Sequence, residues 1–392
     1  MDQQARREGG AGSVVCSRTC LRKVDRFRYA IAPAAISVFI GGYIEALGLF
    51  GLTSGWPIYL ACYAVFVGIH LYGVGEALRL MFAITAVALV ALVVFVIAMA
   101  PKFEFANLFD IEPTGAAGAN SFIPFGYAGV LGALVYGIWF FLAVEGVPLA
   151  AEEANDPERD MPRGIITAMT ILLVTAALML FIAPGGAGSS AIADSDNPLP
   201  EAIRSAFGGD TWVADFVNYV GLAGLVASFF SIVFAYSRQL FALSRAGYLP
   251  RILSVTGARK TPYLALVVPG TIGFLLAAIT ENGALLINIA VFGATVSYVL
   301  MMVSHIVLTI REPELERPYR TPGGVVTTAV ALTLALTAVI ATFFVDKKAA
   351  GITALIFVVA LAYFWFYSRH RLVASAPEEE FAAIQQAESE LS

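Results

Sequence analysis

An acidic residue stands inside one of the most apolar stretches of the sequence, beside two residues that interrupt helices. Glu145 lies in the run IWFFLAVEGVPLAA and is followed by Gly146 and Pro148. Pro148 has no N–H to donate to the carbonyl of Val144, and its ring clashes with that carbonyl. Gly146 weakens a helix further, so we expect a helical break at residues 143–147. A broken helix at membrane depth exposes backbone groups with which transporters bind ions and substrates.

The charge of Glu145 indicates that the ligand is a cation. A carboxylate inside a membrane span costs several kcal/mol unless it is paired or solvated, so it usually faces a cavity. The alternative is an acid at the membrane interface, because Glu152 follows seven residues later, about 10 Å along a helix. An ammonium group beside the freed carbonyls is the ligand that the sequence favours. The predicted binding residues are Ala143, Val144, Glu145 and Gly146.

An aromatic residue precedes the break by less than two helical turns. Trp139 stands six residues before Glu145, and aromatic faces attract ammonium groups. A tryptophan in a membrane protein often belongs to the interfacial belt instead. Counted from Phe125, however, Trp139 lies about 21 Å into its helix. This depth favours a cavity wall or gate, or plain packing, over the belt.

Three further polar residues are secondary candidates. Glu45 lies at membrane depth but only five residues before Phe50, so an outer rim and a cavity both fit it. Ser228 and Ser231 could offer oxygens to a sodium ion, although serines in membrane helices usually bond their own backbone or a neighbouring helix. The three histidines have no metal-ligand spacing, and we expect neither a metal nor a cofactor.

The composition shows in which solvent these residues lie. Of the 392 residues, 59% are hydrophobic and 14% are charged, and the mean hydropathy is +0.79. Soluble domains carry about 25% charged residues, so the solvent is lipid. The sequence has no nucleic-acid signature, and its three cysteines are too scattered for a disulfide framework. It also lacks a paired nucleophile and base or a phosphate loop, so an enzyme is not expected.

Apolar runs long enough to cross a bilayer predict an all-α integral membrane protein with about ten spans. A barrel is excluded because the runs do not alternate with period two. The runs are 29–50, 57–72, 77–100, 125–150, 163–184, 213–243, 262–280, 284–309, 325–345 and 351–368.

The Lys and Arg residues of the connecting loops predict the orientation. One set of alternate loops holds most of them, while the other set holds only Lys102, Arg204, Lys347 and Lys348. Because positive loops face the cytoplasm, we expect a multi-pass membrane protein with both termini cytoplasmic.

Three motifs in order resemble the amino acid, polyamine and organocation transporter superfamily. They are EGVPLAAEEANDPERDMPRG, SRQLFALSRAGYLP and RPYRTPGG. The first is similar to the broken sixth helix of that superfamily and its cytoplasmic loop, matched by Asn155, Asp156, Pro157, Arg159 and Pro162. Within the superfamily, IWFFLAVEGVPLAAEE and PKFEFANL look most like ethanolamine permeases. The resemblance implies a permease of the cell inner membrane with the five-plus-five inverted-repeat fold, and with Glu145 and Trp139 at the substrate pocket.

The resemblance also implies a departure at the N-terminus. The superfamily fold has twelve helices, and the motifs align the first run with the third of them, so we expect an N-terminally truncated version. The expected parts are a non-membrane arm (1–28), a remnant of the first repeat with family helices 3–5 (29–124), the second repeat with helices 6–10 (125–309), the last two helices (310–368) and a cytoplasmic tail (369–392).

The predicted function is secondary active transport of ethanolamine or a related small amine or amino acid by alternating access. The coupling ion, H⁺ or Na⁺, and the oligomeric state are left open, and membrane lipid is the expected surrounding partner. Two alternatives stand beside it. One is an amino acid permease of different specificity, because a substrate carboxylate would need N–H groups of a half-helix. The other is a truncated membrane protein that does not transport by itself.

Overall fold

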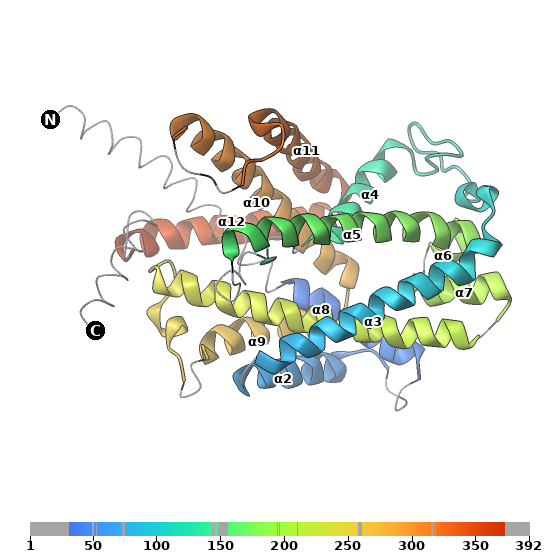
Figure 1. Ribbon diagram of the computed structural model, residues 1–392, viewed down its shortest axis with the longest axis horizontal. Coiled ribbons are helices and arrows are strands. Elements are labelled where there is room, and N and C mark those ends of the chain that lie inside the picture. The colour runs from blue at the N-terminus through green and yellow to red at the C-terminus, as the bar shows by residue number, and fades with distance from the viewer. Residues whose placement is uncertain are drawn as a thin grey trace.

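The computed structural model is all-helical, which confirms the predicted fold class (Figure 1). It describes residues 31–48, 51, 53–72, 75–142, 144, 146–147, 156–193, 195, 197–209, 211–257, 261–314, 317 and 319–372, with the backbone alone at 75–80 and 344–345. Throughout these ranges there is no strand.

Seven of the described helices are long and apolar enough to cross a membrane by length and composition. They are α3 (Gly75–Met99), α5 (Pro157–Ala187), α8 (Trp212–Arg245), α9 (Tyr263–Thr280), α10 (Gly283–Arg311), α11 (Gly324–Val345) and α12 (Lys347–Phe366). Three shorter apolar helices complete the set: Ile31–Ala46, α2 (Trp56–Tyr72) and α4 (Gly126–Phe140). All ten fall on the predicted apolar runs.

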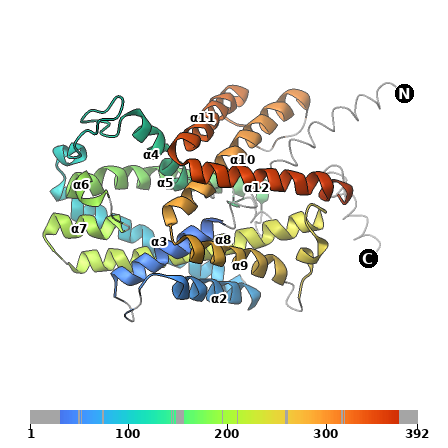
Figure 2. The same cartoon turned by 180° about the vertical axis from the view of Figure 1, so that it is seen from behind.

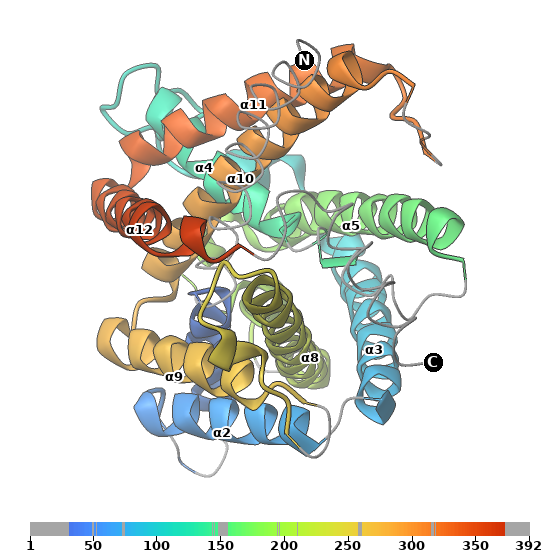
Figure 3. The ribbon, with the colours of Figure 1, turned by 90° about the vertical axis from the view of Figure 1, so that its left-hand side faces the viewer.

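The helices pack around two apolar regions. The larger region joins the helix Ile31–Ala46 to α2, α4, α8, α9, α10 and α12. The second region joins α3, α5 and α8 to a short helix, α7 (Pro198–Phe207). Helix α8 therefore belongs to both. Seen from behind, α12 lies across the bundle with the α10 and α11 pair to one side (Figure 2). Viewed along the bundle, α2 and α9 lie side by side next to α8 (Figure 3).

Close approach of α2, α8 and α9 depends on a glycine. A Cβ added to Gly270 of α9 would lie 3.1 Å from Cγ2 of Val67 and 3.4 Å from the hydroxyl of Tyr236. That hydroxyl donates a hydrogen bond to the carbonyl of Leu266, at 3.1 Å. Small residues at crossing points let membrane helices pack closely, and here the glycine leaves room for an interhelical hydrogen bond.

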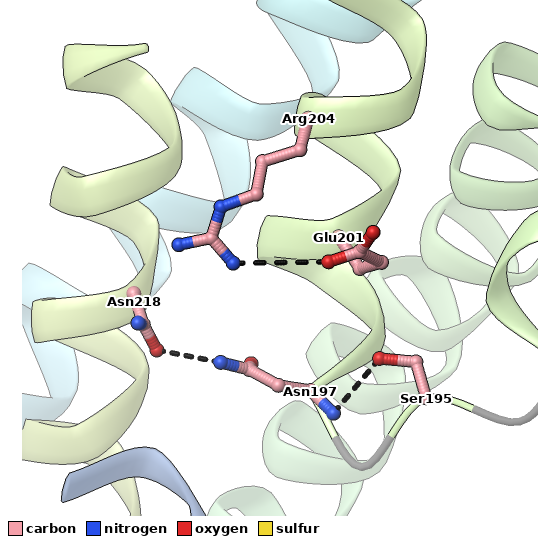
Figure 4. Close-up of polar contacts among 5 residues, drawn as sticks. All are labelled: Ser195, Asn197, Glu201, Arg204 and Asn218. Atoms are coloured by element: carbon pink, nitrogen blue, oxygen red, sulfur yellow. Dashed lines mark hydrogen bonds and ion pairs between the residues drawn. The ribbon is translucent and has the colours of Figure 1, made fainter. Parts of the chain in front are cut away.

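The apolar runs did not predict α7 (Pro198–Phe207), a helix of 10 residues between α5 and α8. Its buried side chains, Pro200, Ala202 and Ile203, face α5 and α8. Figure 4 shows its polar contacts: Nδ2 of Asn197, just before α7, donates to Oδ1 of Asn218 in α8 at 2.7 Å, and within α7 Arg204 lies 3.7 Å from Glu201. Because Asn218 is fully buried in α8, this amide pair fixes the start of α7 to the bundle.

Candidate functional site

Helix α4 ends inside its apolar run. Its last residue is Phe140, earlier than the predicted break at 143–147. The N–H of Phe141 bonds to the carbonyl of Ile138 at 3.0 Å, and the N–H of Leu142 bonds to that of Trp139 at 3.2 Å. Such i to i+3 bonds tighten a final helical turn. The interruption therefore begins before the glycine and proline that signal it in the sequence.

The residues just after α4 are partly described. Val144, Gly146 and Val147 have the geometry of a 3₁₀ turn, and they are partly buried. A Cβ built on Gly146 would meet no atom within 4 Å, so there is open space beside the backbone at this point. The predicted site residues Ala143 and Glu145 lie outside the described residues, as does Pro148.

Trp139 lies in the last turn of α4, on the side that faces the bundle. It is partly buried and packs, together with Ile138, against the larger apolar region to which Val135 of α4 also belongs. Helix α4 contacts α10 and α11. The side chain is thus positioned within the bundle and next to the end of the helix, an arrangement that suits both a cavity wall and plain packing.

The three secondary candidates lie at exposed positions. Glu45 is exposed near the end of the helix Ile31–Ala46, and its Oε2 accepts a hydrogen bond from the N–H of Ser54 at 2.9 Å. Ser228 and Ser231 are exposed on α8, and the hydroxyl of Ser231 donates to the carbonyl of Ala227 at 2.9 Å. This geometry matches the rim position for Glu45 and the backbone bond usual for membrane serines.

Two kinds of polar contact made by Asp346 were not predicted from the sequence. Nδ2 of Asn288, buried in α10, donates to Oδ2 of Asp346 at 3.0 Å. Oδ1 of the same Asp346 accepts the N–H groups of Lys348 and Ala349 and so caps α12. A polar residue within an apolar run was the available signal, but its partner is 58 residues away in the sequence.

The RPYRTPGG motif closes the α10 and α11 hairpin. One guanidinium nitrogen of Arg317 donates to the carbonyls of Leu308 and Glu312, at 3.3 and 2.8 Å, where α10 ends. Nδ1 of His305 lies 3.0 Å from the hydroxyl of Thr328 in α11. These contacts hold the turn between the two helices, so the motif positions α10 and α11.

A bundle of apolar helices in which one helix stops inside its apolar run is typical of multi-pass membrane transporters. Comparison with known proteins identifies the family. Residues 27–367 match the family model described as amino acid permease. The chain belongs to the amino acid permease family.

Curated relatives are transporters as well. The branched-chain amino acid permease of Bacillus subtilis is 33% identical over 222 residues, which cover 55% of this chain and 46% of the relative. An uncharacterized transporter of Rhizobium meliloti is 26% identical over 87% of this chain and 72% of the relative. The methylthioribose transporter of Bacillus subtilis is 26% identical over 65% of this chain and 54% of the relative. The chain thus spans about half the length of two of these relatives. By name, the family and these relatives are permeases and transporters, not enzymes.

Proposed function

We propose that this permease carries small organic amines by secondary active transport, with ethanolamine as its leading substrate. The observation that carries the proposal is the end of α4 at Phe140, inside an apolar run and just before Glu145. Membership of the amino acid permease family supports transport as the activity. The choice of substrate is inferred from the chemistry at this helix end.

The end of α4 offers two kinds of negative charge. The carbonyls at the end of a helix carry a partial negative charge, and in α4 those of Ile138 and Trp139 also accept the N–H groups of Phe141 and Leu142. The carboxylate of Glu145 follows within two turns. A protonated amine can bind both, and the ring of Trp139, in the last turn of α4, can add a cation–π contact. Ethanolamine has an ammonium group and no carboxylate, so it places no further demand on the site.

A second candidate substrate class is the branched-chain amino acids. It is favoured by the identity of 33% with the branched-chain amino acid permease of Bacillus subtilis. Such substrates carry the same ammonium group, and their carboxylate would bind N–H groups at the start of a helix. The two classes therefore share the Glu145 contact and differ in the need for backbone donors.

Competition in reconstituted vesicles distinguishes the two. The purified chain is assayed for binding and counterflow uptake of labelled ethanolamine, with unlabelled ethanolamine, leucine or methylthioribose as competitors. We expect ethanolamine to compete and leucine to have little effect. Displacement by leucine, together with direct uptake of leucine, would select the second candidate. Binding of neither compound would reject the proposal.

We also propose that the chain lies in the inner membrane with both termini in the cytoplasm, on the strength of the Lys and Arg distribution. Single cysteines placed in the loop between α10 and α11, in a variant without the native cysteines, should resist an impermeant thiol reagent in intact cells. Cysteines placed in the loop between α3 and α4 should react. The reverse pattern would invert the proposed orientation.

A further inference from the structure

The C-terminal end of α8 packs against the residues that follow α12. Gly247, just after α8, has a φ of +82°, and a Cβ added to it would collide with the carbonyl oxygen of Arg371. The hydroxyl of buried Ser368 donates to the carbonyl of Tyr248 at 2.8 Å. Around this contact, Leu243, Ala246 and Tyr248 pack against Leu249, Phe364 and Leu372. The two chain segments therefore form one surface.

Three exposed arginines surround this junction, and we call them the α8–α12 arginine cluster: Arg245, Arg369 and Arg371. Each guanidinium lies over an aromatic ring, and the distances from its central carbon to the ring centroid are 5.7 Å for Arg245 and Phe241, 4.4 Å for Arg369 and Trp365, and 4.2 Å for Arg371 and Tyr367. Stacking on a ring limits the conformations of a guanidinium and leaves its N–H groups at the edge able to bind an anion.

These positive charges lack an acidic partner within the described part of the chain. There, no ion pair joins a member of the cluster to a carboxylate. Nε of Arg369 donates to Nε2 of His370 at 2.8 Å, and Arg371 donates to the hydroxyl of Tyr367 at 2.7 Å, so neither of these acceptors is a carboxylate. The cluster thus presents several positive charges to whatever lies at the end of α12.

The depth of the cluster points to the lipid headgroups. Helix α12 has 20 residues, which span about 30 Å, the thickness of the hydrocarbon core of a bilayer. Residues directly beyond its end, including Arg369 and Arg371, lie at headgroup level. Along the same helix, Leu355, Val358 and Phe366 are 65%, 62% and 80% exposed. An apolar surface for acyl chains therefore leads to a cationic end.

We propose that the α8–α12 arginine cluster binds the phosphate of an anionic phospholipid, whose acyl chains lie along α12. Guanidinium groups bind phosphate oxygens through paired hydrogen bonds, and basic sites between helices at the cytoplasmic surface recruit anionic lipids. One lipid bound to both Arg245 and Arg371 would hold the ends of α8 and α12 together. This proposal concerns a different surface from the substrate site and does not depend on the identity of the substrate.

Two other anionic groups could bind the same arginines, and the experiment distinguishes them from a lipid. Inorganic phosphate has the same chemistry without acyl chains. The acidic stretch formed by Glu378, Glu379 and Glu380 follows the cluster in the sequence and lies outside the described residues. The favoured occupant is the lipid, because the exposed apolar face of α12 leads to the cluster. Only a lipid has acyl chains that would cover this face.

The experiment counts lipids bound to the purified chain by native mass spectrometry, with phosphatidylglycerol and phosphatidylcholine added in parallel. The variants are R245Q, R371Q, the double variant R245Q/R371Q and, as a matched control, R320Q, an exposed arginine on the α10 and α11 hairpin. Each arginine near anionic lipid contributes about fivefold in affinity. We expect selective binding of phosphatidylglycerol, about 25-fold weaker in the double variant and unchanged in R320Q.

The contrary results are equally specific. Equal binding of the two lipids, or equal loss in R320Q, would overturn the proposal, as would full displacement by millimolar inorganic phosphate. If phosphatidylglycerol binds only after Glu378, Glu379 and Glu380 are changed to Gln, the acidic stretch is the occupant and the proposal is wrong. Melting temperatures of all variants in phosphatidylcholine, expected to be equal, show that the substitutions leave the fold intact.

Discussion

Helices α4 and α10 contact each other and are both largely apolar, but they end very differently. Helix α4 stops after 15 residues, whereas α10 continues for 29. Helix α10 begins with Asn282, whose side chain accepts the N–H of Leu285 at 2.9 Å, and Arg317 binds the carbonyls at its end. No side chain caps the start of α4 at Phe125, its end is closed by backbone N–H groups that bond to the carbonyls of Ile138 and Trp139, and the sequence after it contains Glu145 and Pro148.

Burial separates the two helices in the same way. In α10, twelve residues are buried, among them Leu286, Ala290 and Ala294, while in α4 the buried residues are Gly126 and Val135. Apolar composition alone therefore does not define the role of a helix in this bundle. A continuous and buried helix supports the packing, whereas the shorter helix that stops inside its apolar run is the candidate for binding a ligand.

The largest effect is expected from a proline inside the supporting helix. Ala294→Pro removes the hydrogen bond to the carbonyl of Ala290 and introduces a clash with it, at a cost of about 3 kcal/mol or more. The melting temperature of the purified protein in detergent should fall strongly. The control is Val147→Pro, beyond the end of α4, which should have a much smaller effect. Equal destabilisation would show that α4 and α10 do not differ as described.

A smaller effect is expected where α10 holds the start of α12. Asn288→Leu removes the hydrogen bond to Asp346, and hydrogen bonds to charged groups contribute about 1.5 to 3 kcal/mol. A double-mutant cycle with Asp346→Asn, read from denaturation curves, should give a clear coupling energy. Strict additivity would mean that the 3.0 Å contact contributes nothing to stability.

The smallest effect concerns pH. Burial alone would raise the pKa of Asp346, but hydrogen bonds from the N–H of Ala349, the amide of Asn288 and the N–H of Lys348 outweigh it, so the pKa lies below the ordinary value of 3.8. A carboxylate with a lowered folded-state pKa stabilises the fold above pH 3.8, and this stability is lost as the pH falls through the folded value. The difference in melting temperature between the wild type and Asp346→Asn should therefore shrink in strong acid. A constant difference would contradict the assignment.

Much of this architecture could be predicted from the sequence, because the hydrophobic run length reports membrane spans directly. All ten runs contain helices, and the interruption of the fourth follows from Gly146 and Pro148. The residue at which the interruption begins could not be predicted in this way, because the helix already tightens at Phe141, before Gly146 and Pro148. Helix α7 was missed because its 10 residues are amphipathic and too short for a span.

The positions of the polar residues could be predicted from the sequence less well than the helices. Depth along a helix could not distinguish a rim from a cavity position for Glu45, because the choice depends on the loop that returns Ser54 to its carboxylate. The bond between Asn288 and Asp346 depends on how two hairpins pack. At the candidate site Trp139 lies at the end of α4, and the roles of Trp139 and Glu145 in binding both stay predictions.

The binding of ethanolamine to Glu145→Gln tests the central claim most directly. The substitution keeps the volume of the side chain and removes its charge, and the matched control is Glu45→Gln, an exposed acid whose carboxylate accepts the N–H of Ser54. Dissociation constants are measured for the purified chain with labelled ethanolamine. We predict affinity about five- to 150-fold weaker for Glu145→Gln and unchanged for Glu45→Gln. Equal affinity of Glu145→Gln and the wild type would show that the acid after α4 does not bind the amine.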